Sequence, residues 1–486
     1  MKPLLCVTVT ALTTRELRIR RDEIADADLI ELRLDSVADP DVAGALAGRR
    51  RPVVVTCRPR WEGGAFDGSE EERRRLLTEA LALGAEYVDV EWRARSDELM
   101  SLTRGKRIVL SMHDYDGVPR DLADQVRAMG ATGADVVKVA VRPRCLRDCL
   151  SLLEIGRARS QHADLVLIGM SEYGLVTRVL PARFGSVWTY AGLQSDVGQL
   201  TPSSLIEEFR FRDVSDATKV YGLVGQPVAH SVSPAMHNAA FRDARLDAVY
   251  LPLPAVDPDD FITFARALGI DGVSVTTPFK VPLFKRIGDA SAAARRIGAV
   301  NTIRMTNGHW TTDNTDASGF LQSLNDRFPL AGTRASVLGA GGAARAIAIA
   351  LAAGGAVVSI HARNPNGAEE VAGFVSGRAL PWPPAPGTWD LLVNCTPIGM
   401  HPHVEETPIG AERLTGRAVY DLVYNPPTTR LLREATAAGL ETFGGLEMLI
   451  EQARQQFHLW TGVWPSAAVM REAALKRLSQ FEVARR

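Results

Sequence analysis

The stretch ASVLGAGGAARAIAIALAAGG, residues 335–355, is the most informative segment of this 486-residue chain. Its apolar start predicts a strand, its glycine run predicts a tight turn, and its alanine-rich remainder predicts a helix. Gly339, Gly341 and Ala344 fit the pattern GxGxxA. Such glycines let the backbone and the helix N-terminus approach the pyrophosphate of a dinucleotide. Because the motif joins a predicted strand to a predicted helix, it indicates a doubly wound, Rossmann-type lobe.

The next segment, AVVSIHAR (356–363), is the expected second strand of this lobe, and the residues at its end select the cofactor. Folds that bind NAD place Asp or Glu there for the ribose hydroxyl. This chain has Arg363 and Asn364 at that point and no acid. A guanidinium can pair with a 2′-phosphate, so the sequence favours NADP, although an ordinary surface arginine would look the same.

Three segments upstream carry side chains that suit a small anionic substrate. GQPVAHSVSPAMHN (225–238) places Ser231 and Ser233 at the start of a predicted helix. Hydroxyls and amides there suit a carboxylate, although ordinary N-caps give the same pattern. Lys280 follows a predicted strand in SVTTPFK, and Asp316 lies in the loop NTDASG. A lysine and an aspartate can together move a proton to a carbonyl that receives a hydride, although each alone would be an ordinary surface charge.

The first half of the chain has a different pattern, in which short β-rich runs alternate with amphipathic helical stretches. The eight runs are LLCVTVT (4–10), LIELRLD (29–35), PVVVTCR (52–58), YVDVEW (87–92), RIVLSMHD (107–114), VVKVAV (136–141), LVLIGMS (165–171) and VWTYAG (187–192). The first run is interpreted as a strand rather than a signal peptide, because it is short and charged residues follow it. Eight strand–helix repeats predict a closed parallel (β/α)8 TIM barrel.

Such a barrel places catalytic residues at the C-terminal ends of its strands. Lys138 has the apolar neighbours DVVKVAV, and desolvation there would favour a neutral amine that can form a Schiff base with a ketone. His113, on the adjacent predicted strand, can transfer protons near neutral pH, and Glu91 could orient it. Each of these residues alone is more often structural, but their convergence on one barrel mouth indicates a catalytic site. Three arginines at the same ends can bind a carboxylate: Arg33, Arg58 and Arg178.

These residues resemble those of type I 3-dehydroquinate dehydratases. The matching segments are ELRLD (31–35), TCR with EGG (56–64), DVE (89–91), SMHD (111–114), DVVKVA (135–140), GMSEYGLVTR (169–178) and GQ (198–199). The resemblance implies that Lys138 forms an imine with the substrate ketone, that His113 moves the proton, and that Glu91 positions His113. It also implies six substrate-binding residues: Glu31, Arg33, Arg58, Arg178, Ser195 and Gln199.

The second half resembles shikimate dehydrogenases. The matching segments are GQPVAHSVSP (225–234), SVTTPFK (274–280), GAVNTI (298–303), NTD (314–316), GAGGAARA (339–346), NCTPIGM (394–400), YDLVYNP (420–426) and GLEMLIEQARQQFHLWTG (445–462). The resemblance implies that Lys280 and Asp316 are the catalytic pair. The substrate site would hold Ser231, Ser233, Thr276, Asn301, Tyr424 and Gln452. The cofactor site would hold Gly339, Ala340, Gly341, Gly342, Ala343, Arg363, Asn364, Thr396 and Met448.

The expected architecture is α/β throughout. A TIM barrel is expected over 1–214, a substrate-binding lobe over 219–330 completed by helices over 445–486, and a Rossmann lobe that binds NADP over 331–444. The resemblance implies that the barrel dehydrates 3-dehydroquinate to 3-dehydroshikimate and that the second part reduces this ketone to shikimate with NADPH. Three alternatives stay open: a preference for quinate in the second part, a metabolite-sensing regulatory relative without catalysis, and a chain in which only one half is active.

Composition excludes several other classes of protein. Lys+Arg total 56 against 57 Asp+Glu, so no basic excess indicates nucleic acid. No apolar stretch is long enough to span a bilayer. Five scattered cysteines, without zinc-ligand spacing, fit a reducing, cytoplasmic compartment. We expect no metal, and the small-molecule substrates are the only partners that the sequence indicates; it does not fix an oligomeric state.

Overall fold

The computed structural model describes residues 2–94, 97–158, 163–324 and 327–483. Two compact units emerge: Met1–Thr218 with Leu253–Gly269, and Lys219–Pro252 with Ile270–Arg486. The first division falls between Thr218 and Lys219. Across the four described ranges, no helix has the length and hydropathy needed to cross a membrane.

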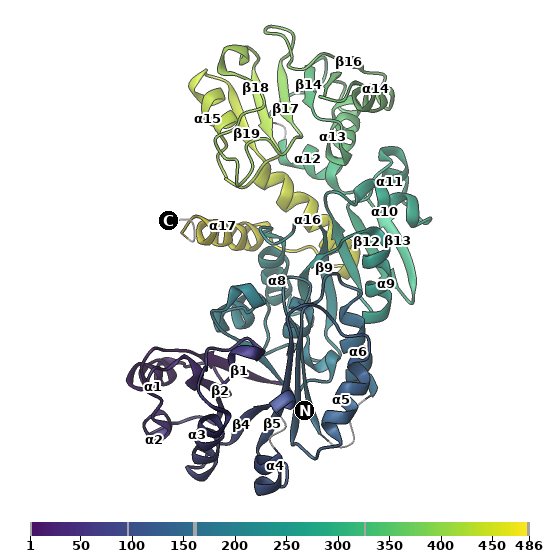
Figure 1. The fold of residues 1–486 in the computed structure, drawn as a ribbon. Coiled ribbons are helices and arrows are strands. Elements are labelled where there is room, and N and C mark those ends of the chain that lie inside the picture. The colour runs from purple at the N-terminus through teal and green to yellow at the C-terminus, as the bar shows by residue number, and fades with distance from the viewer. Residues whose placement is uncertain (1, 95–96, 159–162, 325–326, 484–486) are drawn as a thin grey trace. The chain divides into compact units, whose positions relative to one another are not determined.

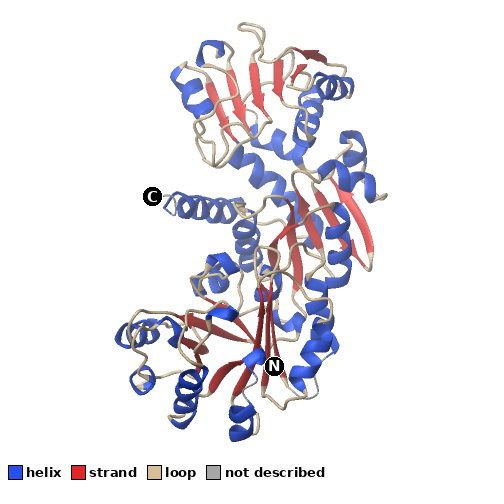
Figure 2. Cartoon of the chain, viewed as in Figure 1, coloured by secondary structure: helices blue, strands red, loops and turns tan. Residues whose placement is uncertain are grey.

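The first unit contains an eight-stranded parallel sheet that curls into a ring, with helices outside it (Figures 1 and 2). The strands are β1 (Leu4–Val9), β2 (Leu29–Arg33), β3 (Val53–Thr56), β4 (Tyr87–Glu91), β5 (Ile108–Asp114), β6 (Val136–Val141), β7 (Asp164–Gly169) and β8 (Trp188–Ala191). Strand β1 pairs with both β2 and β8, and Leu165 of β7 forms an isolated bridge with Ser186, which lies two residues before β8. All eight predicted strands are present, so the barrel prediction is confirmed.

The helices of this ring alternate with the strands along the chain. They are α1 (Thr14–Glu23), α2 (Val42–Leu46), α3 (Glu70–Ala82), α4 (Asp97–Thr103), α5 (Leu122–Gly130), α6 (Cys149–Ala158) and α7 (Leu175–Val179). Helix α3 shows how the sequence sets such an element. Ser69 caps it by accepting a hydrogen bond from the Glu72 amide, and acidic residues follow in the first turn. Leu76 and Leu77 lie on its buried face, which also carries Arg73.

Helix α9 (Pro258–Leu268) is grouped with the first unit, although it lies in sequence between two strands of the second. The buried Asp260 carboxylate accepts hydrogen bonds from the backbone amides of Leu146 (3.2 Å) and Arg147 (2.8 Å). Arg183 donates to the Leu268 carbonyl (3.0 Å) at the other end of the helix, where a cation also interacts favourably with the helix dipole. These contacts explain the grouping.

The second unit contains a mixed five-stranded sheet in the order β10-β9-β11-β12-β13. Its strands are β9 (Lys219–Gly225), β10 (Ala248–Pro254), β11 (Gly272–Val275), β12 (Thr302–Thr306) and β13 (His309–Asp313). The helices of this part are α8 (Ser233–Asp243), α10 (Lys280–Arg286), α11 (Ala292–Ile297), α12 (Asp316–Leu324), α16 (Gly445–Thr461) and α17 (Ala467–Val483). Phe457 of α16 and Met470 of α17 share a hydrophobic core with Phe241 of α8, so the C-terminal helices complete this lobe.

A six-stranded parallel sheet in the order β16-β15-β14-β17-β18-β19 forms the other lobe of the second unit. Its strands are β14 (Arg334–Leu338), β15 (Val357–His361), β16 (Arg378–Leu380), β17 (Leu391–Asn394), β18 (Ala418–Asp421) and β19 (Glu441–Gly444). The helices α13 (Gly342–Ala353), α14 (Pro365–Gly373) and α15 (Arg430–Ala437) pack on it (Figure 1). The strand order reverses around β14, and dinucleotides bind at such a switch point. The predicted strand–turn–helix over 335–355 is therefore confirmed as β14 and α13.

Candidate active sites

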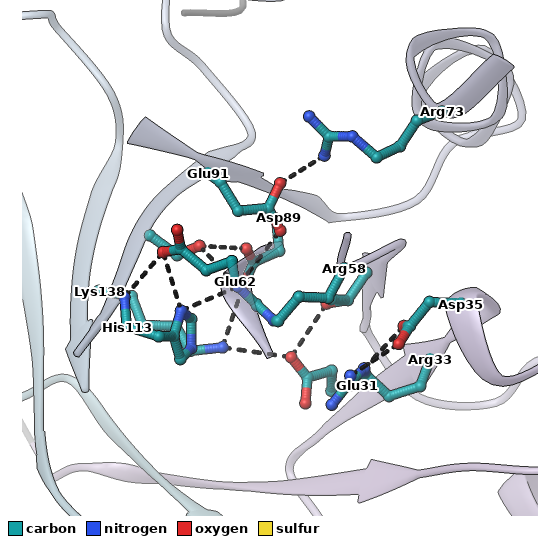
Figure 3. A network of polar contacts seen from close by, with 12 residues as sticks. Glu31, Arg33, Asp35, Arg58, Glu62, Arg73, Asp89, Glu91, His113 and Lys138 are labelled. Atoms are coloured by element: carbon teal, nitrogen blue, oxygen red, sulfur yellow. Dashed lines mark hydrogen bonds and ion pairs between the residues drawn. The ribbon is translucent and has the colours of Figure 1, made fainter. Parts of the chain in front are cut away.

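Lys138 points into a cluster of charged side chains in the barrel (Figure 3). Its side chain is buried, and Nζ lies 2.9 Å from Asp89 Oδ2 and 3.2 Å from Glu31 Oε1. The Tyr190 ring lies beneath the same nitrogen, with its centroid 4.3 Å away. The expectation of apolar surroundings is therefore wrong for the amino group, because β2 and β4 bring carboxylates to it. Glu31 also accepts a hydrogen bond from Thr56 Oγ1 (2.9 Å), which fixes its position.

His113 is mostly buried beside the same cluster, with its side chain 9% exposed and with Arg58 and Glu62 as its neighbours. Arg58 Nη1 lies 2.9 Å from His113 Nδ1, and Glu62 Oε1 lies 3.4 Å from that nitrogen. Glu62 also accepts a hydrogen bond from the His113 amide (2.8 Å). Burial, and then Arg58 and Lys138, hold the pKa of His113 well below its usual value. The imidazole is therefore neutral near pH 7 and able to accept a proton.

Glu91 does not occupy the position that the sequence analysis gave it. Its carboxylate pairs with Arg73 and lies 3.2 Å from Arg58 Nη1, whereas Glu62 contacts His113. The prediction that Glu91 positions His113 is thus corrected in favour of Glu62. Asp89 completes the cluster by pairing with Arg58 (3.0 Å). Although burial acts to raise it, Arg58 and Lys138 hold the pKa of Asp89 below its usual value.

The three predicted carboxylate-binding arginines differ in their partners. Arg33 makes two hydrogen bonds of 2.8 Å to Asp35, and Arg58 pairs with the carboxylates described above. Within the described part of the chain, Arg178 has no carboxylate partner; it donates to the Val197 carbonyl (2.8 Å). Burial lowers the pKa of Arg178 to about 10, so this guanidinium stays charged at neutral pH and is the best placed of the three to take a new anion.

Two further predicted residues follow β8. Gln199 accepts a hydrogen bond from the Gln194 amide (3.1 Å) through Oε1, so its side chain orders the turn in which it lies. The side chain of Ser195 lies outside the described part of the structure.

The second unit brings Lys280 and Asp316 together. Lys280 Nζ lies 2.5 Å from Asp316 Oδ2. Asn301 Nδ2 donates to Asp316 Oδ1 (2.8 Å) and lies 3.3 Å from Gln452 Oε1. Asn301 and Asp316 are buried, whereas Lys280 is partly exposed. Four residues predicted from separate segments therefore form one polar site.

The remaining predicted substrate-binding residues lie at the ends of neighbouring elements. Ser231 Oγ accepts a hydrogen bond from the Ser233 amide (3.1 Å) at the start of α8 and also contacts the Tyr424 hydroxyl. Thr276 directly follows β11 and remains partly exposed. The N-cap of α8 is Val232, which makes no side-chain cap, so neither serine is the N-cap that the alternative expected. Ser231 instead orders the turn before α8, and its contact with Tyr424 brings in a side chain from beyond β18.

The glycine turn after β14 has the shape that a dinucleotide requires. Gly339 has φ +112°, which strains any other residue. A Cβ on Gly341 would meet nothing within 4 Å, so space lies open beside the N-terminus of α13. A Cβ on Gly342 would lie 3.2 Å from Lys280 Cβ, so the turn adjoins the Lys280–Asp316 pair. These residues, with Ala340 and Ala343, fit a bound pyrophosphate.

The other predicted cofactor residues have different surroundings. Arg363 is exposed at the end of β15, and the Asn364 side chain caps α14. Thr396 donates to Asn394 Oδ1 (2.6 Å) in the loop after β17. Met448 is mostly buried in the hydrophobic core of the nucleotide lobe. Arg363 is therefore free to meet a phosphate from solvent, and Thr396 lies on an ordered loop.

Three polar residues that lie in or beside these sites were not predicted from the sequence: Glu62, Asp89 and Asp421. Glu62 lies in the quoted EGG segment, four positions after Arg58, and that spacing was the available signal. Asp421 is buried at the end of β18 and accepts hydrogen bonds from Asn394 Nδ2 (2.9 Å) and Thr429 Oγ1 (2.6 Å). Asp421 lies in YDLVYNP, but its type and position gave no sign of these partners.

Three family models match the chain. The model described as type I 3-dehydroquinase matches residues 5–216. The shikimate dehydrogenase substrate binding domain matches 223–303, and the shikimate 5′-dehydrogenase C-terminal domain matches 445–475.

Curated relatives and solved structures agree with these matches. A protein of Arabidopsis thaliana, called bifunctional 3-dehydroquinate dehydratase/shikimate dehydrogenase, chloroplastic, is 35% identical over 502 aligned positions, which cover 95% of this chain and 82% of the relative. The shikimate dehydrogenase (NADP(+)) of Methanothermobacter thermautotrophicus is 41% identical, covering 54% of this chain and 98% of the relative. The structure of shikimate 5-dehydrogenase from Thermus thermophilus with NADP(H) and shikimate has a TM-score of 0.50 and 38% identity, covering 54% of this chain and all of that one.

Proposed function

Because the chain belongs to the family of bifunctional 3-dehydroquinate dehydratase/shikimate dehydrogenases, we propose that the two buried charged sites divide its two reactions between them. The chain is a lyase and an NADP-dependent oxidoreductase of the shikimate pathway. The barrel dehydrates 3-dehydroquinate to 3-dehydroshikimate, and the second unit reduces that product to shikimate. The observation that carries the division is that each site contains one lysine within hydrogen-bonding distance of an aspartate, Lys138 with Asp89 and Lys280 with Asp316.

In the barrel, Lys138 Nζ attacks the substrate ketone and, with loss of water, forms an imine. The imine acidifies the adjacent carbon, from which His113 removes a proton. His113 then returns that proton to the departing hydroxyl, which leaves as water, and hydrolysis of the imine frees Lys138. Glu62 is the positioning residue for His113, in the place that the sequence analysis gave to Glu91. Glu31, Arg33, Arg58, Arg178, Ser195 and Gln199 bind the substrate hydroxyls and carboxylate.

Arg178 provides the sharpest test of substrate binding in the barrel. The guanidinium of Arg178 lacks a carboxylate partner among the described residues, so it is available to the substrate carboxylate. Arg178→Met should therefore raise KM for 3-dehydroquinate by about 10- to 100-fold, which is the loss of binding expected for one charged hydrogen bond. The kcat should change little. Arg178→Lys, which keeps the charge without the fork of donors, should give an intermediate KM. Steady-state kinetics of the dehydratase reaction measures both, and an unchanged KM in Arg178→Met would refute this role.

In the second unit, Lys280 and Asp316 hold and move the proton that the substrate carbonyl oxygen receives. Lys280 donates it from Nζ, and Asp316 keeps the ammonium in place. Asn301 and Gln452 extend the same polar site. The complete set of proposed substrate-binding residues is Ser231, Ser233, Thr276, Asn301, Tyr424 and Gln452.

NADPH supplies the hydride when it is bound. Gly339, Ala340, Gly341, Gly342 and Ala343 would hold its pyrophosphate at the start of α13, since the open space beside Gly341 fits that group. The 2′-phosphate would be held by Arg363, next to Asn364. Thr396 and Met448 would line the other end of the same site.

A coupled assay tests this division of labour. Purified protein given 3-dehydroquinate and NADPH should oxidise NADPH, seen as a loss of its absorbance, without any added enzyme. Direct addition of 3-dehydroshikimate should oxidise NADPH without the first reaction. A protein that oxidises no NADPH with either compound would contradict the dehydrogenase reaction. Quinate, the alternative substrate, is tested alongside with NADP and should react poorly.

We further propose three functional domains: the dehydratase over 1–214, the substrate-binding domain over 219–330 with 445–486, and the NADP-binding domain over 331–444. A cytoplasmic location is also proposed. All five cysteines are free, which fits a reducing compartment. Because the Arabidopsis relative is called chloroplastic, fractionation of the source cells with antibody detection is the decisive measurement.

A further inference from the structure

Arg73, on α3, and Glu91, at the end of β4, form an ion pair beside the catalytic cluster of the barrel (Figure 3). Both side chains are 0% exposed. Glu70 also contacts Arg73, at 2.8 Å. Because desolvation offsets most of the attraction, a buried ion pair by itself adds little stability. The pair is therefore better understood through the group that it holds in place.

That group is the guanidinium of Arg58. Glu91 Oε1 lies 3.2 Å from Arg58 Nη1, and Asp89 Oδ2 lies 3.0 Å from Nη2. The same Nη1 lies 3.2 Å from Ser111 Oγ and 2.9 Å from His113 Nδ1. An arginine side chain has many rotamers, and these contacts select one of them. Arg73 connects this arrangement to helix α3, which lies outside the barrel strands.

The contact between Arg58 and His113 determines which form of the imidazole is favoured. A guanidinium has only donors and stays protonated in proteins, so Arg58 must donate and His113 Nδ1 must carry a lone pair. Glu62 Oε1, 3.4 Å from the same nitrogen, favours the opposite state, with a proton on Nδ1. Arg58 and Glu62 therefore compete for one atom of His113.

We infer that Arg73 and Glu91 are positioning residues that hold Arg58 against Nδ1 of His113 and so keep the resting imidazole in its basic form. The inference rests on the proposed role of His113 as the proton carrier. Without the pair, Arg58 leaves Nδ1, Glu62 becomes the dominant partner, and the imidazole takes up a proton before substrate arrives. The charged groups facing His113 are Arg33, Arg58, Glu62, Asp89 and Lys138.

The test is the pH profile of the dehydratase reaction in Glu91→Gln, which keeps the shape and removes the charge. Burial raises the pKa of Glu91 to about 7, so the parent should lose kcat/KM as pH falls through that value and Glu91 gives up the charge that holds Arg58. Glu91→Gln has no carboxylate to protonate, so this acidic limb should be absent and kcat/KM should already be low above pH 7. At neutral pH, kcat/KM should fall by about 10- to 100-fold, as when a residue that orients a catalytic group is lost.

Arg73→Lys is the second variant and keeps a charge opposite Glu91 but lacks the guanidinium fork. It should stabilise the Glu91 carboxylate less than Arg73 does, so its acidic limb should move to higher pH. Arg21→Gln is the matched control. Arg21 is an equally buried arginine on α1 that donates to the carbonyls of Ala45 and Ala47, so its loss should leave the limb unmoved.

Borohydride added with 3-dehydroquinate, followed by mass spectrometry, separates the possible failures. A reduced adduct on Lys138 shows that a variant is folded and still forms the imine. An adduct with an unmoved acidic limb in Glu91→Gln or Arg73→Lys would overturn the inference. If Glu91→Gln gives no adduct, the acidic limb of the pH profile of Arg73→Lys tests the inference in its place. If the parent itself gives no adduct, the proposed role of Lys138 fails instead.

Discussion

Replacement of Lys138 by arginine is expected to abolish the dehydratase reaction while leaving the dehydrogenase reaction unchanged. Arginine keeps a positive charge between Glu31 and Asp89, which lie 3.2 Å and 2.9 Å from Lys138 Nζ. A guanidinium is not deprotonated in proteins, so it cannot attack the ketone. We expect kcat for 3-dehydroquinate to fall by about 10⁴-fold or more, as for the loss of a covalent nucleophile.

Formation of 3-dehydroshikimate is followed by the ultraviolet absorbance of its conjugated enone. The same preparation, given 3-dehydroshikimate and NADPH, should oxidise NADPH at the parental rate, which controls for damage to the second unit. Lys138→Ala removes both the charge and the nucleophile and should be equally inactive. If Lys138→Arg instead turned over 3-dehydroquinate almost as fast as the parent, Lys138 would act as a charge and not as a nucleophile.

The surroundings of Lys138 show what sequence patterns can and cannot predict. Alternation of strands and helices predicted all eight barrel strands, because burial imposes a local periodicity on each element. The apolar neighbours of Lys138 correctly predicted that it is buried. They gave no information about Asp89 and Glu31, which are 49 and 107 residues away in the chain. Contacts across a barrel depend on which strands face each other, and no local pattern contains that information.

The partner of His113 was mistaken for the same reason. Glu91 lies on the adjacent strand, which made it the natural choice, but its side chain faces Arg73 of α3. Glu62 reaches His113 from a short 3-10 helix, Arg60–Glu62, 51 residues earlier. The second unit was easier to predict, because Lys280 and Asp316 both follow strand ends that meet at one edge. The grouping of α9 with the barrel depends on hydrogen bonds to Asp260 from a segment over 100 residues away, so no local pattern could predict it.

Replacement of Lys280 by methionine is expected to stop the reduction of 3-dehydroshikimate without affecting its formation. Methionine keeps much of the side-chain volume beside Gly342 and removes the proton donor that lies 2.5 Å from Asp316. Loss of a general acid lowers kcat by about 10²- to 10⁴-fold. With 3-dehydroquinate and NADPH supplied together, the variant should accumulate the enone and leave NADPH unoxidised, whereas the parent consumes both.

Whether Lys280 and Asp316 act as a unit is decided by a double-mutant cycle. Asp316→Asn keeps a hydrogen-bonding group beside Asn301 but removes the charge that holds the ammonium. Residues that share one proton transfer are strongly non-additive, so Lys280→Met combined with Asp316→Asn should be hardly slower than Lys280→Met alone. Binding of NADPH, measured by the quenching of protein fluorescence, should stay at the parental level in all three variants. If the two losses in kcat instead multiplied, Lys280 and Asp316 would make independent contributions, and the carboxylate would contact the substrate directly rather than act through the lysine.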